Sequence, residues 1–171
     1  MTFASQTPVR RNGHLVPTAL ALAVTGLLCV LHLRLLGASW PLLWLPVTVV
    51  ALWPSRVSPV LSALVLVAGG LWVDFATLGA PGQWPLVFLM IYAVIRPDQR
   101  AAPNGLVSGL SRVAVALIIA VAVLGLTGRI VYGVWPDVTS IGRGVLVAML
   151  LSPLAIAGRA AATRAMSGDD V

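Results

Sequence analysis

Side chains that could carry out chemistry are few in this chain, and they do not form catalytic patterns. The sequence has two histidines, one cysteine, five aspartates and no glutamate. A zinc-type metal site needs three or four such ligands close together, and a serine hydrolase of the α/β type needs a Gly-x-Ser-x-Gly turn, which this sequence lacks. A pair of aspartates in neighbouring apolar runs would suggest a membrane protease, but Asp74 is the only acid inside any run. We therefore expect no catalytic, cofactor-binding or metal-ligating residues and no enzymatic activity.

Three ionisable residues lie within apolar runs, where a charge is costly and by default suggests a functional role. They are Arg34, Asp74 and Arg129, and each lies a few residues before the end of its run. If the three runs are helices pointing the same way, their depths differ by only about 6 Å at 1.5 Å per residue. We expect a polar layer in which Asp74 pairs with Arg129, Arg34 or both. Two alternatives stay open: Arg34 extends to the lipid headgroups, and the Asp74 carboxylate caps a turn.

Small residues surround Asp74 in the sequence. Gly69 and Gly70 precede it by about one helical turn, and Gly70 shares its helix face. We expect the backbone of another helix to approach closely there. The segment that contains Pro81 and Gly82 is a turn by composition.

The composition requires a membrane to explain it. Hydrophobic residues make up 59% of the 171 and charged residues only 9%, with a mean hydropathy of +0.99, whereas a soluble domain has about 25% charged residues. The sequence predicts an all-α bundle of six transmembrane helices with short second and fourth spans. The predicted runs are Leu15–Leu36, Trp40–Trp53, Val57–Leu78, Trp84–Ile95, Val113–Trp135 and Ile141–Ala157.

Arginine placement predicts the orientation of these runs. The segments that would share a side with the N-terminus contain Arg10, Arg11, Arg56, Arg96, Arg100, Arg112, Arg159 and Arg164. The opposite turns, 37–39, 79–83 and 136–140, contain none. Since cytoplasmic loops are rich in Arg and Lys, we expect both termini in the cytoplasm. Four spans, with the second and fourth runs re-entrant, would put Arg56 on the opposite side and the arginine-free turn 79–83 in the cytoplasm.

The same pattern divides the chain into three parts. We expect a cytoplasmic N-terminal tail at 1–14, a membrane domain at 15–158 in contact with lipid, and a cytoplasmic C-terminal tail at 159–171. The net charge of +6 comes entirely from arginines at the ends of apolar runs. Because they neither cluster nor alternate with aromatic residues, we expect no nucleic-acid partner.

One segment resembles a known family. Residues 70–75 read Gly-Leu-Trp-Val-Asp-Phe, a turn with Pro81 and Gly82 follows, and the next apolar run ends in Ile91-Tyr92-Ala93. This pattern resembles the rod shape-determining protein MreD, a family of small bacterial inner-membrane proteins, over roughly residues 15–160. The turn departs from the family pattern, in which another residue separates the proline from the glycine.

The resemblance implies a multi-pass, non-catalytic component of the machinery that elongates rod-shaped cells and supports peptidoglycan synthesis. Its implied partners are an MreC-type bitopic scaffold and, through it, the MreB filament, the RodA glycosyltransferase and its transpeptidase. The alternative is a substrate-binding subunit of an energy-coupling-factor vitamin transporter, which is similar in length and span number. Such a subunit would enclose a small-molecule pocket lined by Arg34, Asp74 and Arg129.

Overall fold

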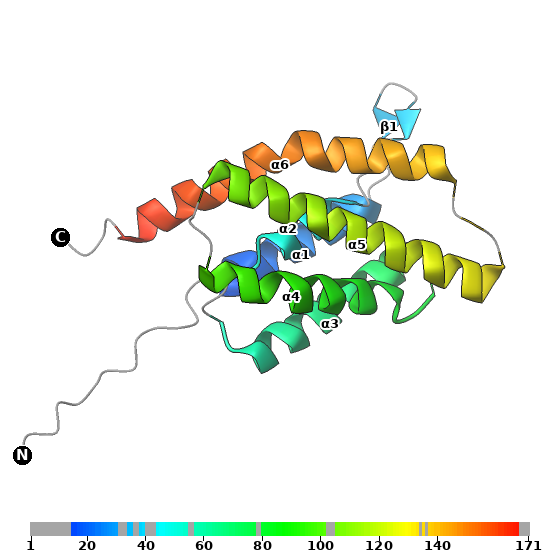
Figure 1. The fold of residues 1–171 in the computed structure, drawn as a ribbon, viewed down its shortest axis with the longest axis horizontal. Helices are drawn as coiled ribbons and strands as arrows, with labels where there is room; N and C mark the ends of the chain where they lie inside the picture. The colour runs from blue at the N-terminus through cyan, green and yellow to red at the C-terminus, as the bar shows by residue number, and fades with distance from the viewer. Residues whose placement is uncertain are drawn as a thin grey trace, which may run out of the picture.

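The fold of the chain, taken from a computed structural model, is a bundle of helices (Figure 1). The structure describes residues 15–30, 34–35, 38–39, 44–54, 57–77, 80–101, 105–133, 135 and 137–167. These residues form six helices and a two-stranded β-hairpin. In chain order the elements are α1 (Leu15–Val30), β1 (Arg34–Leu35), β2 (Ala38–Ser39), α2 (Leu45–Ala51), α3 (Pro59–Thr77), α4 (Gln83–Ala101), α5 (Leu106–Tyr132) and α6 (Val138–Ser167). The helical fold class predicted from the sequence is confirmed.

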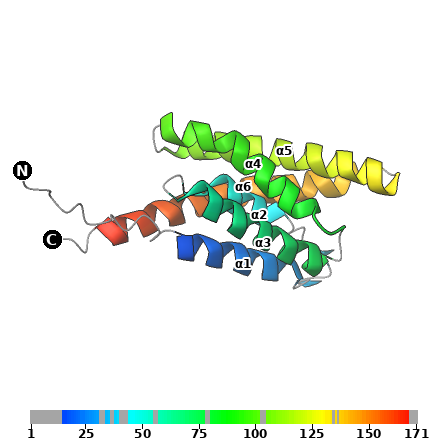
Figure 2. The same ribbon diagram turned by 90° about the horizontal axis from the view of Figure 1, so that it is seen from below.

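The long helices alternate in direction along the bundle. In Figures 1 and 2, α1, α3 and α5 run one way, and α4 and α6 run back. Helix α3 packs between α1 and α4, and α5 packs against α2, α4 and α6. The start of α1 and the end of α6 therefore lie at the same end of the bundle.

Three helices in the described part of the chain are long and apolar enough to cross a membrane. They are α3, α5 and residues Val138–Gly158 of α6. The apolar parts of α1 and α4, Leu15–Leu28 and Gln83–Arg96, are shorter. At 1.5 Å per residue, α3 is about 28 Å long, close to the roughly 30 Å of a bilayer core.

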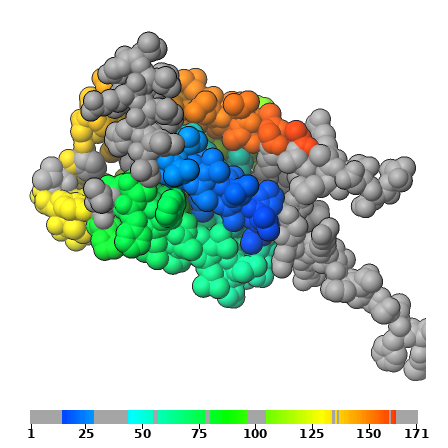
Figure 3. All heavy atoms as spheres, turned by 180° about the vertical axis from the view of Figure 1, so that it is seen from behind, coloured from blue at the N-terminus to red at the C-terminus, as the bar shows by residue number. Residues whose placement is uncertain are grey.

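The outer surface of the bundle is apolar. Large side chains such as Phe75, Ile118 and Leu150 are about 70% exposed or more, and Figure 3 shows α1 on the outside of the bundle alongside α3. Water would not tolerate so much exposed apolar surface, whereas lipid chains cover it at no cost. Together with the three long helices, this surface indicates a membrane protein.

Helix α2 differs from the span expected at Trp40–Trp53. It has seven residues, which makes it about 10 Å long, too short to cross a bilayer as a helix. Pro46 lies in its first turn, and Pro54 explains its end, because the residue before a proline disfavours helical backbone. Residues of α2 are buried against α1, α4, α5 and α6. Trp44, just before it, packs so tightly on Gly144 of α6 that a Cβ at that glycine would overlap the indole ring. The described part of the second run is a buried core segment.

The first run also ends earlier than predicted. The described part of helix α1 ends at Val30, and Arg34 and Leu35 are not helical but pair as an antiparallel strand with Ser39 and Ala38. Extending a single helix from Leu15 to Leu36 was therefore wrong.

Two polar segments expected to lie outside the apolar runs are mostly helical. The connection predicted between Arg96 and Arg112 is short, because α4 continues to Ala101 and α5 already begins at Leu106. Likewise α6 continues to Ser167 through the segment expected as a tail. Arginine and alanine favour helices as strongly as apolar residues do, so polarity alone did not mark the helix ends. The predicted N-terminal tail, 1–14, lies outside the described residues.

Candidate functional site at the α3–α4 turn

The turn between α3 and α4 is built by a proline and a glycine. The Gln83 N–H donates a hydrogen bond to the Ala80 carbonyl at 3.2 Å, which closes a four-residue turn. Gly82 has a φ of +93°, a backbone conformation that is unfavourable for residues with a Cβ atom. Pro81 followed by a glycine with positive φ is the pattern of a type II turn. The turn expected at Pro81 and Gly82 is thus present.

Asp74 holds this turn from inside the bundle. Its carboxylate accepts a hydrogen bond from the Gly82 N–H at 2.7 Å and another from the Trp84 N–H at 3.1 Å. The side chain is buried, with 3% of its surface exposed. Each carboxylate oxygen takes one of the two bonds. A residue near the end of α3 therefore caps the start of α4.

This cap completes the hydrogen bonding at the start of α4. The first N–H groups of a helix have no partner within the helix. Here Gln83 donates to the turn, Trp84 donates to Asp74, Pro85 has no N–H, and Leu86 donates to the Gly82 carbonyl at 3.2 Å. A carboxylate at a helix N-terminus is also stabilised by the helix dipole. The burial of Asp74 is therefore compensated without a cationic partner.

Glycines allow the helices to come close enough for this cap. A Cβ placed on Gly70 would lie 2.6 Å from the Cα of Pro85 and would also overlap its nitrogen. A Cβ on Gly69 would instead meet the side chain of Leu22 in α1. Gly70 thus allows the backbones of α3 and α4 to touch one turn before Asp74. This is the close packing that the sequence suggested.

A second polar contact ties the same region to α5. The side-chain amide of Gln83 donates a hydrogen bond to the Thr127 hydroxyl at 2.8 Å. The Thr127 hydroxyl in turn donates to the Val123 carbonyl of its own helix at 2.8 Å. The turn is therefore fixed to α3 by Asp74 and to α5 by Gln83.

Arg129 does not join Asp74. It is exposed, and its guanidinium donates to the Gly133 carbonyl at the end of its own helix. Gly133 has a φ of +69° and ends α5 in the left-handed conformation. The expected Asp74–Arg129 ion pair is thus not formed; the Asp74 carboxylate binds backbone N–H groups, and Arg129 binds a backbone carbonyl. The alternative, a carboxylate that caps a turn, describes Asp74 correctly.

Arg34 lies outside the helical layer predicted for it. It belongs to β1, at the end of the bundle where α3 and α5 also end (Figure 1). The backbone of Arg34 thus lies at the end of the bundle where the helices of Asp74 and Arg129 end (Figure 1). The side chain of Arg34 lies outside the described part of the structure.

The sequence analysis missed two polar groups that the structure uses. Asp137 caps α6: its carboxylate accepts hydrogen bonds from the hydroxyls of Thr139 at 2.6 Å and Ser140 at 2.8 Å, and from the N–H groups of both residues. An aspartate directly before an apolar helical run is a recognisable start signal. Inside the bundle, the Trp53 indole N–H donates to the Ser62 hydroxyl at 3.0 Å. No local pattern marks that pair, because the two residues lie on different elements.

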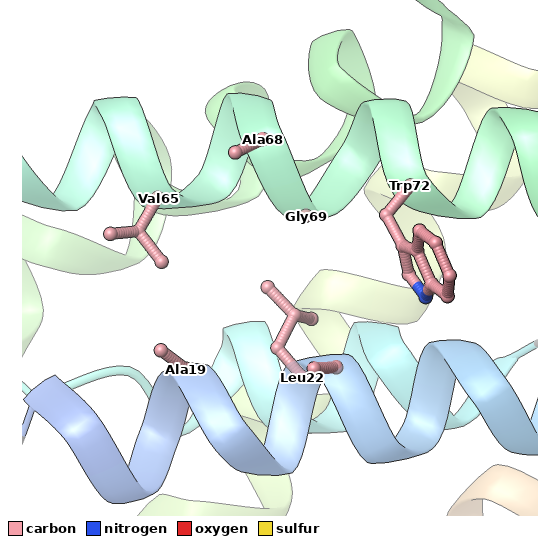
Figure 4. Close-up of a pocket in the computed structure, with 7 residues that line it drawn as sticks. Ala19, Leu22, Val65, Ala68, Gly69 and Trp72 are labelled. Carbon is pink, nitrogen blue, oxygen red and sulfur yellow. The ribbon is translucent and has the colours of Figure 1, made fainter.

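An open apolar groove of about 240 Å³ lies between α1 and α3 (Figure 4). It is lined by Ala19, Leu22, Ala23, Val65, Ala68, Gly69 and Trp72. None of these side chains is charged, and none belongs to the predicted polar layer. Within the described ranges, no group of three or more His, Cys, Asp and Glu side chains is placed to hold a metal ion.

Comparisons with protein-family models, curated proteins and solved structures give no match to this chain. Its functional assignment therefore rests on its own residues and geometry.

Proposed function

We propose that this chain is a non-catalytic inner-membrane component of the bacterial cell-elongation complex, of the MreD type. The observation that supports the proposal is the hydrogen-bonded unit at the α3–α4 turn. Gly70, Asp74, Pro81 and Gly82, which carry the resemblance, all take part in it. All four motif residues stabilise the packing of α3, the turn and α4. A structural role of this kind explains the motif without a bound substrate.

In this proposal the chain crosses the inner membrane six times with both termini in the cytoplasm. The alternating direction of the long helices supports this topology (Figures 1 and 2), as does the arginine distribution. The second crossing in this topology includes α2, which is only about 10 Å long, and the non-helical residues 52–54 that follow it. Non-helical backbone is tolerated at membrane depth where protein buries it, and Trp53 and Pro54, which follow α2, are buried.

Reporter fusions test the topology. Alkaline phosphatase is active only outside the cytoplasm, and green fluorescent protein made by the general secretion route fluoresces only inside it. We expect phosphatase activity from a fusion after Gly82 and fluorescence from fusions after Pro54 and Gly105. A four-span chain with re-entrant second and fourth runs would reverse the results after Pro54 and Gly82 and leave the result after Gly105 unchanged.

With this topology the protein would act by contact with other membrane proteins. Its described helices leave large apolar faces, with exposed residues such as Leu64 and Phe75 on α3 and Ile118 on α5. Helices in lipid associate through such faces by close packing. We propose that one of them receives the membrane helix of an MreC-type scaffold, which links the chain to the MreB filament, the RodA glycosyltransferase and its transpeptidase.

The vitamin-transporter alternative is less well supported. A substrate-binding subunit needs an enclosed pocket with a few polar groups that orient the substrate. The groove between α1 and α3 is open and apolar, and both Asp74 and Arg129 are satisfied by backbone groups. No specific observation in the described residues favours this role.

Depletion in a rod-shaped host cell tests the proposed function. We expect depleted cells to widen and become round, and the tagged protein to co-purify with a bitopic scaffold. The wild-type gene should restore width, whereas an Asp74→Ala gene should restore it poorly, because the α3–α4 turn would lose its cap. Gly142→Ala is the matched control, since nothing lies within 4 Å of the position of its Cβ. Unchanged cell width on depletion, or a vitamin retained on purification, would refute the proposal.

A further inference from the structure

Arg96 holds an unusual position near the end of α4. Its guanidinium carbon lies 5.4 Å from the centre of the Tyr92 ring, one helical turn earlier. Tyr92 and Ile95 are buried, with 9% and 3% of their surfaces exposed. The ring therefore cannot move freely, and it holds the cation in a fixed place by a cation–π contact.

The guanidinium has no anionic partner in the described part of the chain. Its Nε is buried and has no hydrogen-bond acceptor. Among the described residues, no carboxylate forms an ion pair with it. The side chain as a whole is only partly buried, so it is accessible from outside the bundle. A desolvated cation of this kind is costly unless an anion from outside approaches it.

The position of Arg96 in the bundle indicates which anion is available. It ends the apolar part of α4, Gln83–Arg96, at the end of the bundle where α1, α3 and α5 begin (Figure 1). The end of an apolar helical stretch in a membrane protein lies at the level of the lipid headgroups. The anion present there at high concentration is the lipid phosphate.

We propose that Arg96 is part of a binding site for the phosphate of an anionic lipid headgroup. The planar guanidinium offers parallel N–H groups that match a phosphate, and stacking on Tyr92 orients that plane in advance. An arginine that simply extends into the headgroup region would need no aromatic support, and removing the Tyr92 ring would leave its lipid binding unchanged. This inference needs the chain in a membrane but does not depend on a role in cell elongation.

Lipid titration with native mass spectrometry tests the site. The full-length protein in detergent is titrated separately with short-chain phosphatidylglycerol, short-chain phosphatidylcholine and inorganic phosphate. We expect the wild type to prefer phosphatidylglycerol. Arg96→Gln should weaken that binding about five-fold, which corresponds to the roughly 1 kcal/mol of one arginine at an anionic surface. Arg96→Lys, which keeps the charge but not the planar fork, should lose part of the binding.

Two variants serve as controls for charge and for stacking. Arg129→Gln removes an exposed arginine at the opposite end of the bundle and should leave the preference unchanged. Tyr92→Leu keeps the arginine but removes the ring, and should weaken binding in the same direction as Arg96→Gln.

Three results would overturn the proposal. The first is equal binding of the two lipids by the wild type, which can be measured even if a variant fails to fold. The second is an equal effect of Arg96→Gln and Arg129→Gln. The third is displacement of phosphatidylglycerol by inorganic phosphate at equal concentration, which would show a site for the free ion.

Discussion

The carboxylate of Asp74 accepts a hydrogen bond from the backbone N–H of Trp84 at 3.1 Å, so a side chain of α3 determines where α4 begins. The same carboxylate binds the N–H of Gly82 within the turn. Helix caps usually come from the residue directly before the helix. Here the capping residue lies eight to ten residues before the N–H groups that it binds. It therefore joins α3 to α4 as well as capping the start of α4.

Loss of this cap should destabilise the protein strongly. Asp74→Ala removes the acceptor of two N–H groups: that of Trp84 is buried and costs about 1–3 kcal/mol when unpaired, whereas that of Gly82 belongs to an exposed residue. We expect a loss of about 1–3 kcal/mol in the free energy of unfolding, measured by denaturant titration in detergent. Asp74→Asn retains one acceptor oxygen and should cost about half as much. Equal stability of wild type and Asp74→Ala would mean that the two hydrogen bonds contribute nothing.

A charge swap distinguishes the cap from the ion pair. If Asp74 acts only as a cap, Asp74→Arg combined with Arg129→Asp should be no more stable than the sum of the two single changes predicts. The measured coupling free energy should lie within about 0.5 kcal/mol of zero, as for independent sites. A rescue of 1 kcal/mol or more would show that the two groups interact directly.

The residues of this site could be identified from the sequence, but their partners could not. Asp74 stood out because an acid in an apolar run is rare, and Pro81 with Gly82 because they mark a turn. Hydrophobic runs predict the depth of a residue in the bundle but not the direction in which it points. The partners of Asp74 are backbone N–H groups, which exist at the start of every helix, so no search by residue type reveals them.

The fold shows the same division between what the sequence specifies and what packing decides. The long runs at α3, α5 and α6 are helices, as their length and hydropathy predicted. The segment Trp40–Trp53 is equally apolar, yet its described residues, 44–53, contain only the seven-residue α2. Prolines limit its length, and contacts with four other helices, far away in sequence, bury it. Hydropathy cannot distinguish burial in protein from burial in lipid.

Three glycines should respond differently to alanine. Gly70→Ala places a methyl group against the backbone of Pro85, which cannot shift without moving α4, so we expect a loss of about 1–3 kcal/mol. Gly69→Ala meets only the Leu22 side chain, which can rotate, so the loss should be smaller. Gly142→Ala in α6 has free space and should be neutral or gain up to about 1 kcal/mol from helix propensity. The free energies of unfolding of the three variants, measured in the same detergent, rank the effects of the substitutions. Equal losses at all three positions would contradict the close approach of α3 and α4.

Asp137 should make the stability of the fold depend on pH, through its cap at the start of α6. Hydrogen bonds from the side chains of Thr139 and Ser140, and then from their N–H groups, lower the pKa of this carboxyl from 3.8 to about 2. Because the pKa in the folded state lies below that in the unfolded state, ionised Asp137 stabilises the fold fully above about pH 4. That contribution should decrease as the pH falls from 4 and be lost below pH 2.

The titration of the Asp137 carboxyl carbon by NMR measures this pKa directly. Asp137→Asn keeps one acceptor oxygen and cannot ionise, so it is the matched control. The stability difference between wild type and Asp137→Asn should be constant from pH 7 to pH 5 and should shrink towards pH 2. A carboxyl that titrates near 3.8 would show that the hydroxyls of Thr139 and Ser140 do not bind it.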